Sequence, residues 1–272
     1  MNELRGTMKP YYQDEWVTIY NEDCLDTMKK MPDNLIDLTV TSPPYDNLRK
    51  YNGYSFDFES IARELFRVTK VGGVVVWIVG DATINGSETG TSFKQALYFK
   101  EIGFNLHDTM IYQKKNILPR DPRILRYYQE FEYMFVFSRE KPKTCNHIRV
   151  DCKHAGKKAV PYSRNNDNSL RLDRKIKNKD HIINKTKIIG NVWKYSVTSN
   201  KIHPAPFPEQ LANDHIISWS NEGDVVYDPF MGSGTTGKMA KLNNRYCIAS
   251  EISEAYCTIS AKRMCQEVMN FA

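Results

Sequence analysis

The sequence predicts an α/β fold with a doubly wound, mostly parallel sheet, because short apolar runs alternate along the chain with segments of helical periodicity. Five runs are rich in β-branched and aromatic residues and end at turn residues, as buried parallel strands do; they cover residues 36–40, 71–79, 133–137, 225–227 and 246–249. Helical segments are expected at 58–68, 92–103, 208–219 and 253–269. The first of them places one apolar stripe toward the sheet, made of Phe58, Ile61, Ala62, Leu65 and Phe66.

The composition is that of an ordinary globular protein. The chain has 272 residues, of which 41% are hydrophobic and 26% charged, so it is long enough to bury a large core. No apolar run approaches the roughly 20 residues that cross a bilayer, and residues 1–16 lack the apolar core of a signal peptide. The six cysteines form no C-x-x-C pair, which disfavours a disulfide framework. We therefore expect a soluble cytosolic protein with no membrane contact.

The positive charge is concentrated in one segment. Residues 139–190 contain fifteen Lys or Arg against five Asp or Glu, a balance of +10, so the net charge of +6 leaves +6 − 10 = −4 for the rest. This segment is also rich in Asn and has no clear periodicity. It predicts a basic insertion that faces a polyanion, with a solvated insertion without a partner as the alternative. The chain is accordingly divided into residues 1–138, an insertion at 139–190, and residues 191–272.

A glycine-rich turn follows the predicted strand at 225–227. Gly232 and Gly234 precede a helix that begins near Thr235, so the backbone can approach a ligand closely and the helix offers free N–H groups. The pattern lacks the residues of G-x-G-x-x-G and of the P-loop. The next strand ends at Glu251, 251 − 234 = 17 positions after Gly234, where a carboxylate often accepts from ribose hydroxyls. The order of turn, strand and acid predicts a nucleoside-containing ligand.

The strand at 36–40 leads into Thr-Ser-Pro-Pro-Tyr at residues 41–45. Two consecutive prolines make a stiff corner that enters neither a helix nor a strand interior. The corner is either a tight strand exit or a pocket wall that must not move.

Together with residues 21–25, 71–81 and 201–211, these motifs resemble the permuted beta class of S-adenosylmethionine-dependent DNA amino-methyltransferases, in which the Ser-Pro-Pro-Tyr motif precedes the cofactor turn. The resemblance covers nearly the whole chain outside 139–190. It implies a Rossmann-like methyltransferase fold, S-adenosylmethionine as cofactor, and double-stranded DNA as partner. It also implies a cytoplasmic protein of a prokaryote or one encoded by a phage. The basic insertion falls where this class keeps its target-recognition region. A cognate restriction endonuclease and a homodimer are further partners that the class suggests.

The resemblance also implies roles for the stiff corner. The Ser42 side chain and the Pro43 carbonyl would accept hydrogens from an exocyclic amino group, while Pro43 and Pro44 keep these acceptors from reorganising. Tyr45 would stack on the extruded base, because an amino group in a base pair is otherwise out of reach. Asp46 and Asp81 either assist proton removal or orient turns.

Cofactor contacts are implied in the same way. Six residues would surround the methionine portion: Asp228, Phe230, Gly232, Ser233, Gly234 and Thr235. Glu251 would take the ribose hydroxyls, Ile252 would pack on adenine, and Asp23 would accept from the adenine amino group. Cys24 would bind the cofactor as part of the same adenine-contacting turn, residues 21–25. Two alternatives stay open: Asp228 as a turn former, and Asp23 as the cap of a helix at 24–31.

DNA contacts are expected from basic residues in the 46–54 loop, in an Arg row at 120, 123 and 126, and in the insertion. The loop is either a lid over DNA or an ordinary surface loop, and the Arg row either meets phosphates or is a solvated helix face. The candidates are Arg49, Lys50, Arg123, Arg126, Lys157, Lys158, Arg164, Arg171, Arg174 and Lys175. Cys145, His147, Cys152 and His154 have a C-x-H spacing that is uncommon for structural zinc, and no metal is predicted. His203 is interpreted as part of a structural turn.

Ser42 decides which base is predicted. Class members with serine at this position are mostly cytosine enzymes, whereas adenine enzymes mostly carry Asp or Asn. We therefore expect methylation of cytosine at N4, with adenine at N6 as the alternative. An RNA methyltransferase and a non-catalytic DNA-binding module of the same fold are the further alternatives.

Overall fold

The computed structural model describes residues 9–44, 56–116, 125–158, 162–165, 167, 169–172, 182–197 and 208–265. It divides the chain into two units, residues 1–146 with 191–272, and residues 147–190. The predicted insertion begins at residue 139, whereas the smaller unit begins at residue 147, eight positions later (147 − 139). The difference arises because residues between these two positions are hydrogen-bonded to the larger unit. Lys143 N donates to Gly72 O at 2.9 Å, and Asn146 N donates to Ser218 O at 2.8 Å.

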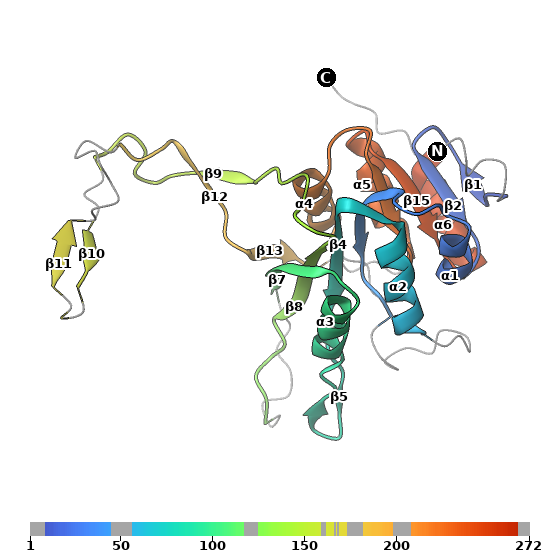
Figure 1. Ribbon diagram of the computed structural model, residues 1–272, viewed down its shortest axis with the longest axis horizontal. Helices are drawn as coiled ribbons and strands as arrows, with labels where there is room; N and C mark the ends of the chain where they lie inside the picture. Colours follow the sequence, from blue (N-terminus) through green and yellow to red (C-terminus); the bar gives the residue numbers. More distant parts are fainter. Residues whose placement is uncertain are drawn as a thin grey trace. The chain divides into compact units, whose positions relative to one another are not determined.

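Within the described residues, nine strands form the sheet of the larger unit in the order β1-β2-β15-β14-β3-β4-β8-β7-β13 (Figure 1). The pairs are parallel except β1–β2, β4–β8 and β7–β8. The predicted doubly wound, mostly parallel sheet is confirmed. The strands are β1 Tyr12–Gln13, β2 Val17–Tyr20, β3 Ile36–Thr41, β4 Thr69–Val79, β7 Asn105–Lys115, β8 Phe131–Ser138, β13 Val192–Ser196, β14 Val225–Asp228 and β15 Tyr246–Ser250.

The direction predicted for the strand at 133–137 was wrong. β8 is antiparallel to both neighbours, with Tyr133 opposite Val79 of β4 and opposite Ile111 of β7. β7 and β8 are consecutive along the chain and adjacent in the sheet, so their connection returns the chain in the opposite direction. Residues 134–138 are buried, and an apolar run reports burial on both faces but not strand direction.

Six helices lie in the described part of the larger unit, in two groups. In the first, α1 Cys24–Lys29 contacts α2 Phe58–Val68, which contacts α3 Thr91–Glu101. This group packs on a core that includes Trp77, Tyr227 and Ile248. In the second, α5 Thr235–Leu242 contacts both α4 Glu209–Trp219 and α6 Glu254–Cys265. Gly237 of α5 lies close to Val17 of β2, so the second group covers the other face of the sheet.

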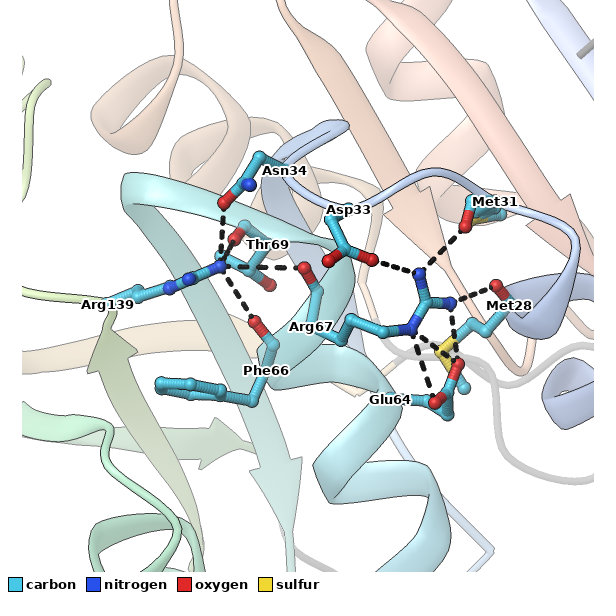
Figure 2. A network of polar contacts seen from close by, with 9 residues as sticks. All are labelled: Met28, Met31, Asp33, Asn34, Glu64, Phe66, Arg67, Thr69 and Arg139. Atoms are coloured by element: carbon cyan, nitrogen blue, oxygen red, sulfur yellow. Dashed lines mark hydrogen bonds and ion pairs between the residues drawn. The ribbon is translucent and has the colours of Figure 1, made fainter.

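Arg67 joins the end of α1 to the end of α2 (Figure 2). Its guanidinium donates to Met28 O at 2.6 Å and to Met31 O at 2.9 Å, which satisfies carbonyls at and just beyond the C-terminus of α1. It also pairs with Glu64 at 2.6 Å and with Asp33 at 2.7 Å. Arg67 and Glu64 are only 29% and 23% exposed, so solvent screens their pair incompletely.

A second guanidinium closes the neighbouring turn. Arg139 donates to Asn34 Oδ1 at 2.7 Å and to Thr69 O at 2.8 Å, and it lies 4.8 Å from the centre of the Phe66 ring (Figure 2). These contacts fix the amino ends of β3 and β4. The opposite ends of the same strands carry the predicted site.

Arg67→Leu is expected to lower the free energy of unfolding by about 2 kcal/mol and Tm by about 5 °C, because it leaves two carbonyls and two carboxylates without this donor. Thermal unfolding followed by circular dichroism measures the change. Arg63→Leu is the matched control on the same helix: its pair with Glu59 is 58% and 61% exposed, so the expected change is below about 0.5 kcal/mol. Equal losses in the two variants would show that the Arg67 contacts add nothing specific.

The smaller unit contains two antiparallel pairs within its described residues. β9 Arg149–Asp151 pairs with β12 Thr186–Ile188, and β10 Tyr162–Arg164 pairs with β11 Leu170–Leu172. A further hairpin, β5 Thr83–Ile84 with β6 Ser87–Glu88, belongs to the larger unit. Among the described residues, none of the helices has the length and apolar character needed to cross a membrane.

Candidate active site

The candidate site lies at one edge of the sheet, where adjacent parallel strands end. β3 ends before Ser42, β14 ends at Asp228, and β15 ends before Glu251. From β3 the chain proceeds to its neighbour β4, and from β14 it proceeds to β15 on the other side. β3 and β14 therefore flank the point where the strand order reverses, and ligands of open α/β sheets bind outside the carboxyl ends of strands at such a point.

Asp228 links the two sequence motifs. Its Oδ1 accepts from Thr41 Oγ1 at 2.7 Å, across the β3–β14 pair, and from Phe230 N at 3.1 Å. The side chain is 1% exposed. Burial raises the pKa of this carboxyl, and the bonds from Thr41 and Phe230 oppose that rise. Asp228 therefore helps to form the turn, which was the alternative role predicted for it. The same oxygen also holds the end of β3 against the glycine turn.

Glu251 holds the glycine turn from the next strand. Its Oε2 accepts from Gly232 N and its Oε1 accepts from Ser253 N, both at 2.8 Å. Burial raises the pKa of this carboxyl too. Each oxygen uses one N–H and keeps capacity for a second donor. Gly232 and Gly234 have φ of +52° and +84°, which favours glycine at both positions.

The segment after β2 completes this side of the site. Asn21 Nδ2 donates to Glu251 O at 2.9 Å and to Ile252 O at 3.1 Å, so the loops after β2 and β15 are tied together. Asp23 caps α1 by accepting from Leu25 N at 2.8 Å. The cap that was the alternative for Asp23 is therefore present, and it engages one of two carboxylate oxygens.

Ser42, Pro43 and Pro44 leave β3 beside Asp228. Pro43 is buried, and Ser42 and Pro44 are half-buried. The ring of Phe230 lies 5.7 Å from that of Phe56 and 6.3 Å from that of Trp77, so the glycine turn packs on aromatic residues of the half that carries Ser42. This packing fixes the two motifs relative to each other.

The sequence also predicted further residues for the site and for DNA contacts. Asp81 accepts from Ser92 N at 2.9 Å and from Ser92 Oγ at 2.5 Å, so it orients the start of α3. Orienting a turn was the second of the two roles predicted for Asp81. Cys24 is buried in α1, Ser233 is buried in the turn, and Thr235 is buried as the first residue of α5. Lys157 and Lys158 are exposed in the smaller unit. Arg164 lies in β10 and Arg171 in β11. Predicted positions outside the described residues are Tyr45, Asp46, Arg49, Lys50, Arg120, Arg123, Arg174, Lys175 and His203.

Sequence reasoning missed Thr41 as a member of the site. A threonine at the end of an apolar run is ordinary strand composition, and only the pairing of β3 with β14 brings its hydroxyl to Asp228. Among the residues that the structure describes, no group of three or more His, Cys, Asp or Glu is arranged to hold a metal ion.

The sequence of this chain is similar to those of known proteins. A family model described as DNA methylase matches residues 36–262. An orphan methyltransferase, M.BamHII of Bacillus amyloliquefaciens, is 55% identical over 240 residues, which cover 85% of this chain and 89% of that one. The DNA adenine methyltransferase YhdJ of Escherichia coli is 27% identical, with 93% and 84% covered.

Solved structures share the fold. The PvuII DNA methyltransferase, described as cytosine-N4-specific, has a TM-score of 0.71 at 23% identity, with 98% of this chain and 92% of that chain covered. The M1.HpyAVI–SAM complex has a TM-score of 0.60 at 23% identity, with 91% and 99% covered.

Proposed function

Since this chain belongs to the N6/N4 DNA methylase family, we propose that it transfers a methyl group from S-adenosylmethionine to the exocyclic N4 of a cytosine flipped out of duplex DNA. The observation that carries the proposal is the Thr41–Asp228 hydrogen bond, which brings the Ser-Pro-Pro segment and the glycine turn to one strand junction. A methyl transfer needs the segment that holds the base and the turn that holds the cofactor to lie side by side, because positioning supplies most of the catalysis.

The hydrogen-bond acceptors among the described residues suit S-adenosylmethionine. Carboxylates follow three neighbouring strands, with Asp23 after β2, Asp228 at the end of β14 and Glu251 after β15. Hydroxyl and amino groups of a nucleoside are donors that such acceptors bind, and a sulfonium carries a positive charge that they favour. The positive φ of Gly232 and Gly234 lets the backbone approach the ligand closely. S-adenosylmethionine, when bound, supplies the electrophilic methyl group.

Ser42 and Pro43 are proposed to act on the amino group of the base. The nitrogen lone pair of such a group is delocalised into the ring, so acceptors that hold its hydrogens favour the attacking geometry. The Ser42 hydroxyl and the Pro43 carbonyl are these acceptors, and the two prolines limit their reorganisation. Tyr45 is proposed to stack on the base. The Asp228 bond to Thr41, one residue before Ser42, holds this segment at the cofactor side.

The choice of cytosine rests on Ser42 and is favoured by the cytosine-N4 description of the PvuII enzyme. The description of YhdJ as an adenine methyltransferase favours N6 of adenine as the second candidate. Both candidates use the same fold, cofactor and acceptors. They differ in the base that the pocket admits.

Duplex DNA is the proposed partner of the smaller unit. Residues 147–190 contain twelve Lys or Arg and four Asp or Glu, a balance of 12 − 4 = +8, which suits a polyphosphate backbone. Several relatives are described as Type II methyltransferases, which favours a cognate restriction endonuclease, whereas the word orphan in the description of M.BamHII opposes one. We also propose a homodimer, because the resemblance to the beta class suggests one.

Nucleoside mass spectrometry tests this proposal on plasmid DNA from a host that lacks its own DNA methylation. N4-methylcytosine is expected with the wild-type chain and not with empty vector or with a Ser42→Ala, Tyr45→Ala double variant. N6-methyladenine in its place would support the second candidate and overturn the interpretation of Ser42. Absence of both bases, with S-adenosylmethionine still bound by the purified protein, would contradict DNA as the substrate.

A further inference from the structure

Two large apolar side chains are fully exposed in the connection between β7 and β8. Leu125 is 100% exposed and Tyr127 is 102% exposed. Among the other described large hydrophobic residues, the highest exposure is 66%, at Leu97. Single exposed apolar residues are common on protein surfaces, but complete exposure of two such residues in one short segment means that the fold gains nothing from either.

This segment lies at the edge of the sheet that carries the candidate site. Val79, at the end of β4, is opposite Tyr133 near the start of β8, so residues 125–130 enter β8 where β4 ends. β3, which leads into Ser42, is the other neighbour of β4 and pairs Thr41 with Trp77. In Figure 1 the hairpin labelled β5 and the coloured residues 125–130 that lead into β8 both extend from the lower edge of the sheet.

The segment is anchored between the two exposed side chains. The Arg126 guanidinium donates to Gly86 O and lies 3.6 Å from Glu88 in the β5–β6 hairpin. At the base of the connection, Lys114 N donates to Glu130 O at 2.7 Å. Arg126 is thus held by the hairpin, while its two apolar neighbours project into solvent. Apolar side chains that flank an anchored residue can press against a partner without being displaced.

We propose that Leu125 and Tyr127 are a wedge that enters the base stack beside the target nucleotide and stabilises the opened duplex. The inference rests on the proposed function, because an enzyme that extrudes a base must open the neighbouring stack. Apolar side chains inserted between base steps unstack and kink DNA in many complexes. A leucine fills the gap that the base leaves, and a tyrosine ring offers a face on which a base stacks. The exposed Lys115 at the end of β7 adds positive charge next to the phosphates.

The test uses two duplexes that contain the site mapped on methylated plasmid DNA. They are identical except that the nucleotide opposite the target is either its normal partner or an abasic residue, which opens the pair in advance. Single-turnover methylation is measured for the wild-type chain and for the Leu125→Ser, Tyr127→Ser variant. Leu242→Ser is the matched control: Leu242 is 49% exposed at the end of α5, which runs away from the carboxyl edge of the sheet.

We expect the wedge variant to lose at least about tenfold in rate on the normal duplex and less than about twofold on the abasic duplex. The control is expected to match the wild-type chain on both. An equal loss on the two duplexes, or no loss on either, would overturn the wedge while leaving methylation intact. A changed oligomeric state of the variant in light scattering would also overturn it, because the side chains would then contact a second copy. If the wild-type chain methylates neither duplex, the proposed function itself fails.

Discussion

Ser42→Ala is expected to lower the rate constant for methyl transfer by about 100- to 1,000-fold, because it removes one acceptor aimed at the reacting amino group. The affinity for S-adenosylmethionine is expected to stay within about twofold of the wild-type value, since the cofactor contacts are assigned to other strands. Ser42 is half-buried at the end of β3, and Thr41, the residue before it, keeps its bond to Asp228 in the variant. Single-turnover methylation measures the rate and isothermal titration calorimetry measures the affinity.

Ser42→Thr is the control for this prediction. It keeps the hydroxyl acceptor, so the expected loss of rate is below about tenfold. A Ser42→Ala variant with an unchanged rate would contradict the acceptor role. An equal fall in rate for the alanine and threonine variants would assign the effect to the shape of the corner and not to the hydroxyl.

Glu251→Gln is expected to weaken S-adenosylmethionine binding by about 100-fold. In the wild-type chain each carboxylate oxygen accepts a backbone N–H, from Gly232 and from Ser253. Glutamine has a single acceptor oxygen, so its NH₂ group meets one of these two donors and displaces either the glycine turn or the start of α6. The site also loses a negative charge. Calorimetric titration with the cofactor measures the change.

Glu254→Gln is the matched control, three positions further along, where the residue is exposed. It removes the same charge without touching the glycine turn, and its affinity is expected to stay within about twofold of wild type. Parallel losses in the two variants would assign the effect to net charge alone. An unchanged affinity in Glu251→Gln would contradict the proposed position of the cofactor.

The sequence was most informative where local chemistry decides the structure. Five apolar runs were found as β3, β4, β8, β14 and β15, because β-branched and aromatic content reports burial of a strand. The order of the Ser-Pro-Pro-Tyr motif, the glycine turn and the following acid resembled one enzyme class, and the DNA methylase family confirms it. The individual roles of the site residues remain predictions.

Strand pairing could not be predicted from the sequence. The antiparallel direction of β8 and the neighbourhood of β3 and β14 depend on contacts between distant segments. The threonine at position 41 has no distinguishing signal until that pairing places it 2.7 Å from Asp228. The complete exposure of Leu125 and Tyr127 could not be predicted from the sequence either, since leucine is usually buried and tyrosine is usually at least partly buried.

The sequence by itself determined the fold class, the family and the cofactor of this protein, because each rests on short segments whose backbone or side-chain chemistry is local. The tertiary structure decided which groups meet: Asp228 with Thr41, Glu251 with Gly232, and Arg126 with the β5–β6 hairpin. These contacts join residues 187, 19 and 38 positions apart (228 − 41, 251 − 232 and 126 − 88). Contacts over such separations are set by how the strands order themselves in the sheet, and no local propensity encodes that order.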